Sequence, residues 1–255
     1  MNNPTLDLIH KHASIRRYKM DPLAAQIIET IISAAQCAST SSHLQAYSVV
    51  AVTDAGKRLR LSELCGNQDH IRQAPVFLAW CADLARLERA CQIRAYTQVK
   101  EYMDNFLIAA MAVSLAAQNA ALAAESLGLG ICYIGSIRNN PVEIVELLGL
   151  PRLTFPITGM TIGWPNEQCD LKPRLPLRSV LHWETYDQTT EDSSLRSYDE
   201  TMIANGIYKG RQVPVPDKPD EMEDYGWTEH SARRVSQGGR AHLRHDLEKQ
   251  GFTLR

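Results

Sequence analysis

Apolar residues that recur every three or four positions mark the clearest helix of the chain, directly after Asp21 and Pro22. They are Leu23, Ile27, Ile28, Ile31, Ile32 and Ala35. This spacing places them on one helix face. Asp21 as N-cap and Pro22 at the first helical position indicate where the helix begins. We therefore predict an amphipathic helix that ends before the Ser/Thr run at residues 39–42.

Short apolar runs, rich in β-branched residues, alternate with helical segments along residues 46–163. The expected strands are Ala46–Thr53, Pro75–Ala82, Ile131–Gly135 and Ile157–Gly163. Further helices are expected over 54–64 and over 140–149, the second one capped by Asn140 and Pro141 and stopped by Gly149. Because the segments between the strands are not uniform crossover units, we predict an α+β fold, a mixed central sheet flanked by helices.

One segment has the length of a membrane span, since residues 105–124 carry no charged side chain. The segment is rich in alanine, however, and it contains Ser114, Gln118 and Asn119, which a membrane interior disfavours. A fully buried central helix explains the pattern better. Small side chains also let neighbouring helices approach closely, so we expect this helix in the core of an oligomer.

The chain becomes polar, with scattered prolines, beyond about residue 186. Residues 217–224 carry five acids against one lysine, which predicts a solvated loop, and arginines recur toward the end of the chain. We therefore predict a core over residues 1–185. Residues 186–255 are expected to be a C-terminal excursion of the same domain that runs over its surface or over a partner subunit.

The composition is that of an ordinary globular protein. The 255 residues include 27 Lys and Arg against 29 Asp and Glu, a formal net charge of −2, and 44% are hydrophobic. These values exclude a strongly basic nucleic-acid-binding surface and an intrinsically disordered chain. The six cysteines have no CxxC spacing and are expected to be reduced. The first residues do not resemble a signal peptide, so we expect a cytoplasmic protein that does not span a membrane.

An imidazole, a hydroxyl and a guanidinium occupy alternate positions near the start of the chain. In an extended segment His12, Ser14 and Arg16 would point to one side while Ile15 points inward. Such a set suits an anionic polyol, because arginine offers a forked donor to phosphate. The alternative is the basic end of a short helix, where cations offset the helix dipole.

Two further segments carry groups that could contact a ligand. Lys172 and Arg174 are held at a fixed spacing by prolines, which suits phosphate, although an ordinary solvated loop is the alternative. Gly128 and Gly130 lead into residues 133–136, where the backbone could approach a flat ligand, or simply form a tight helix-to-strand turn. The sequence has no dinucleotide fingerprint, phosphate loop, metal-ligand set or activated nucleophile, so we expect no metal and no catalytic side chain.

Several short motifs, taken in their order along the chain, match one family. They are HxSIR from His12, a Ser/Thr run before Leu44-Gln45, GNQ from Gly66, AESLGLG from Ala124, YIG from Tyr133, RNN from Arg138, GWP from Gly163 and LKPRLP from Leu171. Over residues 12–176 the chain resembles the NADPH-dependent flavin reductase and oxygen-insensitive nitroreductase branch of the nitroreductase superfamily.

The resemblance implies the nitroreductase fold, an intertwined homodimer and FMN bound non-covalently at the subunit interface. By similarity, the FMN-binding residues would be His12, Ser14, Ile15, Arg16, Thr40, Ser41, Ser42, Gln45, Gln68, Tyr133, Ile134, Gly135, Ser136, Lys172 and Arg174. Ser14 and residues 40–42 would contact the phosphate or the ribityl chain. Gln45 and Gln68 would contact the ring or its ribityl end.

The same resemblance implies roles for the charged residues. His12, Lys172 and Arg174 would hold the phosphate. Arg16 would lie near N1 and O2 of the ring, where its charge would stabilise the reduced flavin. The backbone of residues 134–136 would lie against the ring and direct an N–H toward N5.

The implied chemistry is hydride transfer from NADPH to FMN N5, followed by two-electron reduction of nitroaromatics, quinones or free flavin. This ping-pong cycle needs no acid or base from the protein. Arg211 is the candidate for the 2′-phosphate of NADPH, with a solvated loop as the alternative. Ala13 and Ser136 depart from the basic residue and second glycine common in the family. Two other functions stay open: a flavin reductase that supplies reduced FMN to a partner enzyme, and a flavin-binding or flavin-sensing protein without turnover.

Overall fold

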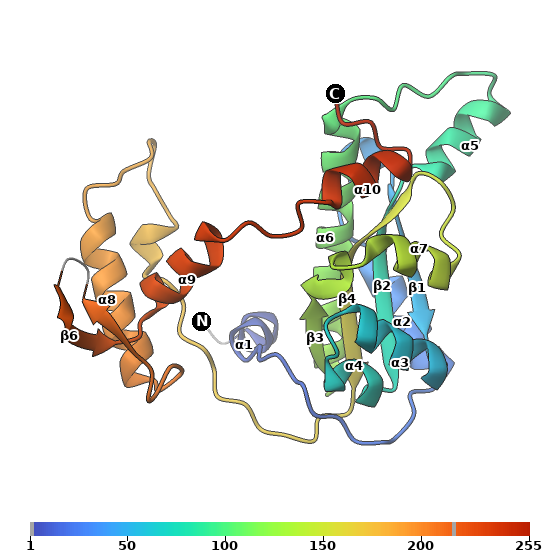
Figure 1. The fold of residues 1–255 in the computed structure, drawn as a ribbon. Coiled ribbons are helices and arrows are strands. Elements are labelled where there is room, and N and C mark those ends of the chain that lie inside the picture. The colour runs from blue at the N-terminus through green and yellow to red at the C-terminus, as the bar shows by residue number, and fades with distance from the viewer. Residues whose placement is uncertain (1–2, 216–217) are drawn as a thin grey trace. The chain divides into compact units, whose positions relative to one another are not determined.

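Two compact units make up the chain in the computed structural model, which describes residues 3–215 and 218–255 (Figure 1). The core unit comprises the described residues up to Asp170 together with Arg240–Arg255, and the tail unit is Leu171–Gly239. From the sequence, the boundary is expected at residue 185. The C-terminal segment belongs to the core unit because Leu247 and Phe252 are buried in its interior, a long-range contact that composition does not reveal.

The core unit is a sheet with helices on both faces. Its strands are β1 (Tyr47–Val52), β2 (Val76–Asp83), β3 (Gly130–Ile134) and β4 (Thr154–Gly163). Its helices are α1 (Pro4–His10), α2 (Ala25–Ala35), α3 (Ala55–Leu64), α4 (Asp69–Gln73), α5 (Ala85–Ile93), α6 (Met103–Ser126), α7 (Pro141–Leu148) and α10 (Leu243–Lys249). The short 3-10 helices are η1 (Ser41–His43) and η2 (Gly135–Arg138). The strands lie within a few residues of the predicted ranges.

The strands follow the order β1-β2-β4-β3, and each neighbouring pair is antiparallel. Ser14 adds a parallel bridge to Ile131 at the outer edge of β3. The predicted α+β class with a mixed sheet is thereby confirmed. β1 and β3 lie at opposite edges of the four strands, which restricts the segments that one chain can bring to a common site.

Successive residues of β2 face opposite sides of the sheet, and both sides are buried. Val76, Leu78 and Trp80 pack in a cluster with α2 and α6. Phe77 and Ala79 pack in a second cluster with α3, α4 and α7. A strand buried on both faces has a continuous apolar sequence, which is why this strand is predictable without any alternation of polar and apolar residues.

Helix α6 crosses one face of the sheet and contacts all four strands. Its buried residues are Ala109, Ala112, Val113, Ala116, Ala117, Ala120, Ala121 and Ala124. By length and composition it is the one helix among the described residues that could cross a membrane. Its face against the sheet is buried as predicted, but Leu107, Met111 and Leu115 are about half exposed in the single chain. Full burial of this helix is therefore wrong for one chain.

Helix α2 begins at Ala25 rather than at Pro22. Asp21 is not its cap, because residues 21–24 are not helical and Leu23 is buried in the core at 8% exposure. Side-chain packing thus outweighs the local capping signal. The end of α7 is as predicted, since Gly149 adopts the left-handed conformation with a φ of 63°.

The tail unit is organised around aromatic rings. Its elements are η3 (Leu177–Ser179), α8 (Glu191–Ala204), β5 (Gln212–Val215), β6 (Lys218–Asp224) and α9 (Trp227–Ser236). The Tyr198 and Trp227 rings meet edge to face, with centroids 5.5 Å apart. Asp199 holds the start of α9, because Thr228 N donates to its Oδ1 at 2.9 Å.

The acidic run is not a solvated loop in its described part, so this prediction is wrong there. Lys218–Asp224 forms β6, which pairs antiparallel with β5. The backbone of β5 supplies the hydrogen-bond partners, and its Val213 is buried at 5% exposure. Neither contribution is visible in the charges of the run itself. Asp217 lies outside the described residues.

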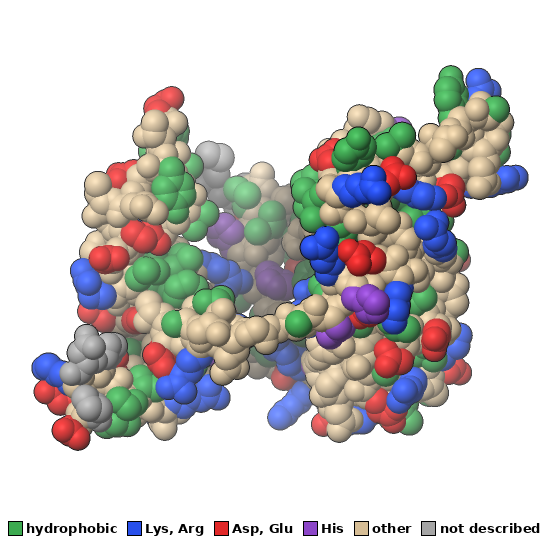
Figure 2. Space-filling view, turned by 45° about the horizontal axis from the view of Figure 1, so that its top comes forward, with side chains coloured by type: hydrophobic (Ala, Val, Ile, Leu, Met, Phe, Trp, Pro, Cys, Tyr) green, Lys and Arg blue, Asp and Glu red, His purple; other side chains and the backbone are tan. Residues whose placement is uncertain are grey.

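Basic and acidic side chains are interspersed over the face shown in Figure 2, as the formal net charge of −2 leads one to expect. Salt screens the field of an exposed charge beyond a Debye length of about 8–10 Å. A positive potential for an anionic ligand must therefore come from cations gathered at one place.

Gly159 on β4 leaves no room for a side chain, since a Cβ there would lie 2.4 Å from Cζ of the buried Phe77. We expect Gly159→Ala to lower the free energy of unfolding by about 1–3 kcal/mol, as overpacking of a core does, measured by urea denaturation. At Gly238 an added Cβ meets nothing within 4 Å, so Gly238→Ala should change this free energy by less than about 0.5 kcal/mol. Equal stability of the two variants would contradict the packing described.

Candidate functional site

The N-terminal segment lies along the outer edge of β3. Ile15 N donates to Ile131 O at 2.8 Å, and Lys19 N donates to Trp164 O at 2.9 Å. The Tyr18 hydroxyl donates to Ile15 O at 2.6 Å. These bonds hold residues 15–19 along the strand edge, with Ile15 buried and the side chain of Arg16 exposed. His12 N donates to Ile9 O at 3.3 Å, so His12 lies at the end of α1 and not in this extended part.

Ile15 anchors this segment, and Gly130 makes room for it. Ile15 is 9% exposed, and a Cβ on Gly130 would lie 2.5 Å from Ile15 Cγ1. The side chain of Ile15 therefore requires glycine at this position, whereas the sequence suggested close approach to a flat ligand. Tyr18 is a second anchor, whose hydroxyl lies 2.8 Å from Thr161 Oγ1 and whose pKa is raised by burial.

Glu167 fixes the backbone of the next two residues. Its Oε1 accepts hydrogen bonds from Arg16 N at 2.5 Å and from Arg17 N at 2.9 Å. Partial burial acts to raise the pKa of this carboxyl, but the two N–H donors outweigh it and the pKa is lowered. The Arg16 side chain stays exposed and is available to a ligand. No sequence motif marks Glu167, because its partners are distant in sequence.

The far end of β3 meets the loop before α4. Gln68 Nε2 donates to Ser136 Oγ at 2.5 Å and to Cys65 O at 2.7 Å. Ser62 Oγ donates to Gln68 O at 2.7 Å and fixes the loop. The structure thus brings together two candidate residues that are distant in sequence. The parallel docking of the N-terminal segment on β3 carries Arg16 toward this same end.

Residues 133–135, at the end of β3, offer a ligand mainly their backbone. Ile134 is 2% exposed and belongs to the core. Tyr133 is half-buried, burial raises its pKa, and its hydroxyl donates to Gln118 Oε1 at 3.4 Å. A Cβ on Gly135 would make only ordinary contact, 3.6 Å from Arg138 Nη2, so space does not require glycine there.

His70, on α4, is buried beside the same end of β3. It is 9% exposed, and its Nε2 has no hydrogen-bond partner among the described residues. Burial first, and then the nearby Arg16 cation, lower the pKa of His70. A single histidine without neighbouring ligand residues gives no sequence signal, so sequence patterns could not identify it.

His12 contacts the last turn of α6. Its Nδ1 lies 2.5 Å from Oε1 of Glu125, whose side chain is 11% exposed. The Oε2 of Glu125 is buried and has no hydrogen-bond partner among the described residues. Because Nδ1 is engaged, Nε2 is the imidazole atom that His12 can present to a ligand.

Thr40, Ser41, Ser42 and Gln45 lie at the opposite edge of the sheet, in the turn before β1. Three strand spacings of about 4.8 Å put the two outer strands roughly 14 Å apart. One chain therefore does not bring this turn to the Arg16 segment.

Lys172 and Arg174 lie in the tail unit, where they line one pocket of about 360 Å³. Arg174 Nη1 donates to Lys172 O at 2.9 Å. The Tyr198 hydroxyl donates to Pro173 O at 3.0 Å and lines the same pocket, as does Trp227. The spacing of the two cations thus places both at one pocket.

Arg211 belongs to a second pocket of the tail unit, about 190 Å³ in volume. Its guanidinium lies 5.8 Å from the centroid of the Tyr225 ring. Tyr208 and Lys209 line the same pocket. A cation beside aromatic rings suits an anionic ligand with a planar part.

Family comparison covers both parts of the chain. Residues 9–164 match the Nitroreductase family, and residues 172–255 match the C-terminal domain of that family. The chain belongs to the nitroreductase family.

Relatives of known name match the chain over nearly its whole length. A CR(VI) reductase of Pseudomonas sp. (strain G-1) is 38% identical over 249 residues, 97% of this chain and 98% of the relative. An FMN reductase (NADPH) of Bacillus subtilis is 36% identical over 258 residues, 99% of each. The structure of the NADPH:FMN oxidoreductase from Vibrio harveyi complexed with NAD+ superposes with a TM-score of 0.86 at 34% identity, covering 99% of this chain and 100% of that one.

The buried His70 should make the free energy of unfolding decrease as the pH is lowered. The unfolded chain takes up a proton at the ordinary pKa of 6.5, whereas the folded chain, with its lowered pKa, does so only at lower pH. Stability is therefore complete above the unfolded pKa and decreases as pH falls through it, by at most about 1.4 kcal/mol per pH unit. Urea denaturation between about pH 7.5 and 5.5 measures this slope. His70→Gln should flatten it, and an equally steep slope in the variant would argue against a neutral His70.

Proposed function

We propose that this protein is an FMN-dependent NAD(P)H oxidoreductase that reduces nitroaromatics, quinones or free flavin. Membership of the nitroreductase family and the names of the full-length relatives support this function. The observation that carries it is the edge of β3, where Ser14 bridges Ile131, Arg16 follows in the same segment, and the Gln68–Ser136 pair lies just beyond the end of the strand.

The residues present fit an anionic cofactor with a flat polar ring. At the edge of β3, Arg16 offers an exposed guanidinium, Ser14 a hydroxyl and Gln68 a side-chain amide. In the tail unit, Lys172 and Arg174 line one pocket. Guanidinium and ammonium groups suit a phosphate, while amide and hydroxyl groups suit the ring edge and the ribityl chain.

When bound, FMN would accept a hydride at N5 and pass two electrons to the oxidant. The residues of the chain would bind and orient it. Arg16 would place positive charge near N1 and O2, the backbone of residues 134–136 would lie near N5, and His12 would present Nε2 to the phosphate. Because this chemistry needs no acid or base from the protein, the role of these residues is to hold the ring and set its electronics.

A second copy of the chain would complete the site. The turn at residues 40–45 lies at the opposite edge of the sheet from Arg16, so its hydroxyl and amide groups would reach the flavin held by the partner. Leu107, Met111 and Leu115 supply an apolar surface on α6 for this homodimer. The cytoplasmic location stays a prediction.

The proposal is tested by titrating the purified protein with FMN and then mixing the complex with NADPH in a stopped-flow instrument. We expect FMN to bind and its absorbance to bleach, followed by reoxidation by a nitrofuran, a quinone, chromate or free FMN. Failure to bind FMN would contradict the proposed cofactor. Binding without bleaching would leave a flavin-binding protein without turnover.

Arg16→Ala should weaken FMN binding by roughly tenfold or more, because a hydrogen bond to a charged group contributes about 1.5–3 kcal/mol. It should also make the bound flavin harder to reduce, since the charge near N1 is lost. Flavin fluorescence and redox titration measure the two effects. Arg17→Ala is the matched control, because Arg17 is the neighbouring exposed cation of the same segment but is not one of the predicted FMN-binding residues. An unchanged reduction potential in Arg16→Ala would contradict the role near N1.

Arg211→Ala should raise KM for NADPH and leave KM for NADH nearly unchanged, because only NADPH carries the 2′-phosphate. The control is Arg233→Ala, whose guanidinium lies 5.8 Å from the centroid of the same Tyr225 ring but which does not line the pocket. Steady-state kinetics with both nucleotides measure the difference. Equal effects of Arg211→Ala on the two nucleotides would exclude a 2′-phosphate contact.

A further inference from the structure

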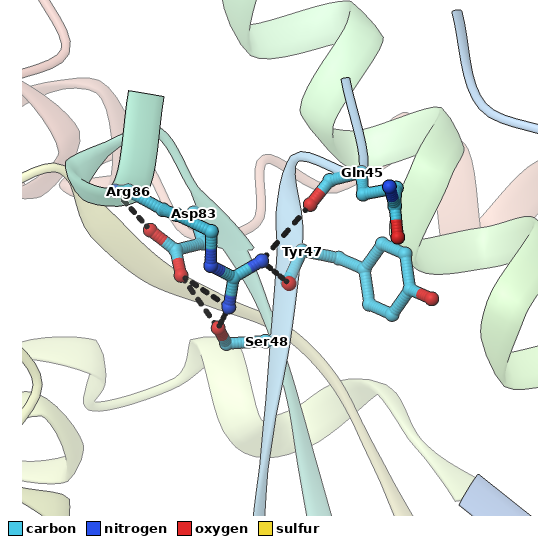
Figure 3. A network of polar contacts seen from close by, with 5 residues as sticks. All are labelled: Gln45, Tyr47, Ser48, Asp83 and Arg86. Carbon is cyan, nitrogen blue, oxygen red and sulfur yellow. Dashed lines mark hydrogen bonds and ion pairs between the residues drawn. The ribbon is translucent and has the colours of Figure 1, made fainter. Parts of the chain in front are cut away.

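A polar network joins the turn before β1 to the start of α5 (Figure 3). Arg86, in the first turn of α5, donates from Nη1 to Gln45 O at 3.2 Å and to Tyr47 O at 3.1 Å. Its Nη2 donates to Ser48 Oγ at 2.8 Å and lies 3.4 Å from Asp83 Oδ2. One guanidinium thus binds the backbone on both sides of the point where the turn enters the strand.

The carboxylate of Asp83 helps to hold the Arg86 guanidinium in place. Its side chain is 9% exposed, and it accepts a hydrogen bond from Ser48 Oγ at 2.5 Å and from Arg86 N at 3.2 Å. The Arg86 side chain, in contrast, is 57% exposed. A cation at the N-terminal end of a helix opposes the helix dipole, so the stability of α5 does not explain why arginine is here.

The turn that Arg86 binds has an unfavourable backbone. Ser42, His43 and Gln45 have φ angles of 47°, 57° and 49°, the left-handed region that residues other than glycine seldom adopt. Such a conformation persists only when the surrounding structure holds it.

Packing does not hold this turn, because the side chains of residues 41–44 are exposed. Hydrogen bonds do: Leu44 N donates to Ser41 O at 2.9 Å, and Gln45 N donates to Thr40 Oγ1 at 3.2 Å. These bonds close the turn on itself. The hydrogen bonds from Arg86 connect the end of the turn, at Gln45, to helix α5.

We propose that Arg86 is a positioning residue that fixes the Thr40–Gln45 turn for flavin binding. This inference rests on the proposed function, since the turn is the element that would reach the FMN held by the partner subunit. Arg86 touches neither the cofactor nor the substrate. It acts by holding the hydroxyl and amide groups of the turn in one arrangement before FMN binds, which lowers the ordering cost of binding.

The first test compares Arg86→Ala with Arg89→Ala in the full-length protein. Arg89 lies on the same helix, and its Nη1 donates to Gln92 Oε1 at 3.3 Å, within the helix and away from the turn. We expect Arg86→Ala to raise the Kd for FMN about tenfold, by fluorescence titration, and Arg89→Ala to change it by less than about twofold. Equal FMN affinity of the two variants, when the unsubstituted protein binds FMN, would overturn the proposal.

The second test is independent of flavin. Hydrogen exchange of the amides in residues 40–47 should be about tenfold faster or more in Arg86→Ala than in the unsubstituted protein and in Arg89→Ala, because the outgoing end of the turn is released. Unchanged exchange would overturn the proposal. If the unsubstituted protein binds no FMN, the proposed function fails, while exchange still decides whether Arg86 holds the turn.

Two further variants separate positioning from mere stabilisation. Arg86→Lys keeps the charge but lacks the planar fork that reaches two carbonyls and a hydroxyl together. Its Kd for FMN should therefore lie between those of the unsubstituted protein and Arg86→Ala. If Arg86→Ala does not fold, Arg86→Lys takes its place in the comparison. Glycine adopts the left-handed conformation without steric cost, so adding His43→Gly to Arg86→Ala should recover part of the affinity. No recovery would contradict an effect exerted through the turn.

Discussion

The contact between Ile15 and Gly130 is the constraint on which the candidate site depends. Ile15 fits against β3 because position 130 has no Cβ, and this contact fixes the register of the N-terminal segment along the strand. Once Ile15 points inward, Ser14 and Arg16 must point the other way. Tyr18 and Glu167 then fix the backbone at Ile15 and at the residues that follow it, through hydrogen bonds to Ile15 O and from Arg16 N. The direction of the guanidinium is thus a consequence of core packing.

The topology of the sheet sets the second constraint. β3 and β1 are opposite outer strands, so one chain places the Arg16 segment and the turn at residues 40–45 at opposite edges of its sheet. The exposed apolar residues of α6 are consistent with a second copy that brings another turn to the site. The turn itself is held in a left-handed backbone by hydrogen bonds. The proposed flavin site therefore combines two sheet edges, each held by hydrogen bonds within its own chain.

The sequence predicted what depends on local order and on strong apolar patterns. The strands, the central helix and the inward direction of Ile15 follow from periodicity, and the candidate residues of the N-terminal segment follow from alternation. The start of α2 and the strand Lys218–Asp224 did not. Leu23 is buried by residues that are distant in sequence, and the pairing with β5 rests on backbone hydrogen bonds that the charges of the run do not reveal. Sequence patterns also missed Glu167, His70 and Arg86, because no short motif connects these residues to the groups around them.

Subunit complementation tests the central claim, a flavin site made from the β3 edge of one chain and the turn of another. A heterodimer would pair an Arg16→Ala chain with a Gln45→Asn chain, in which asparagine keeps the left-handed backbone but shortens the amide's reach. It should contain one intact site and one doubly altered site. The account predicts a biphasic FMN titration in which half of the sites bind with the affinity of the unsubstituted protein. A heterodimer in which both sites bind FMN more weakly than the unsubstituted protein would contradict it.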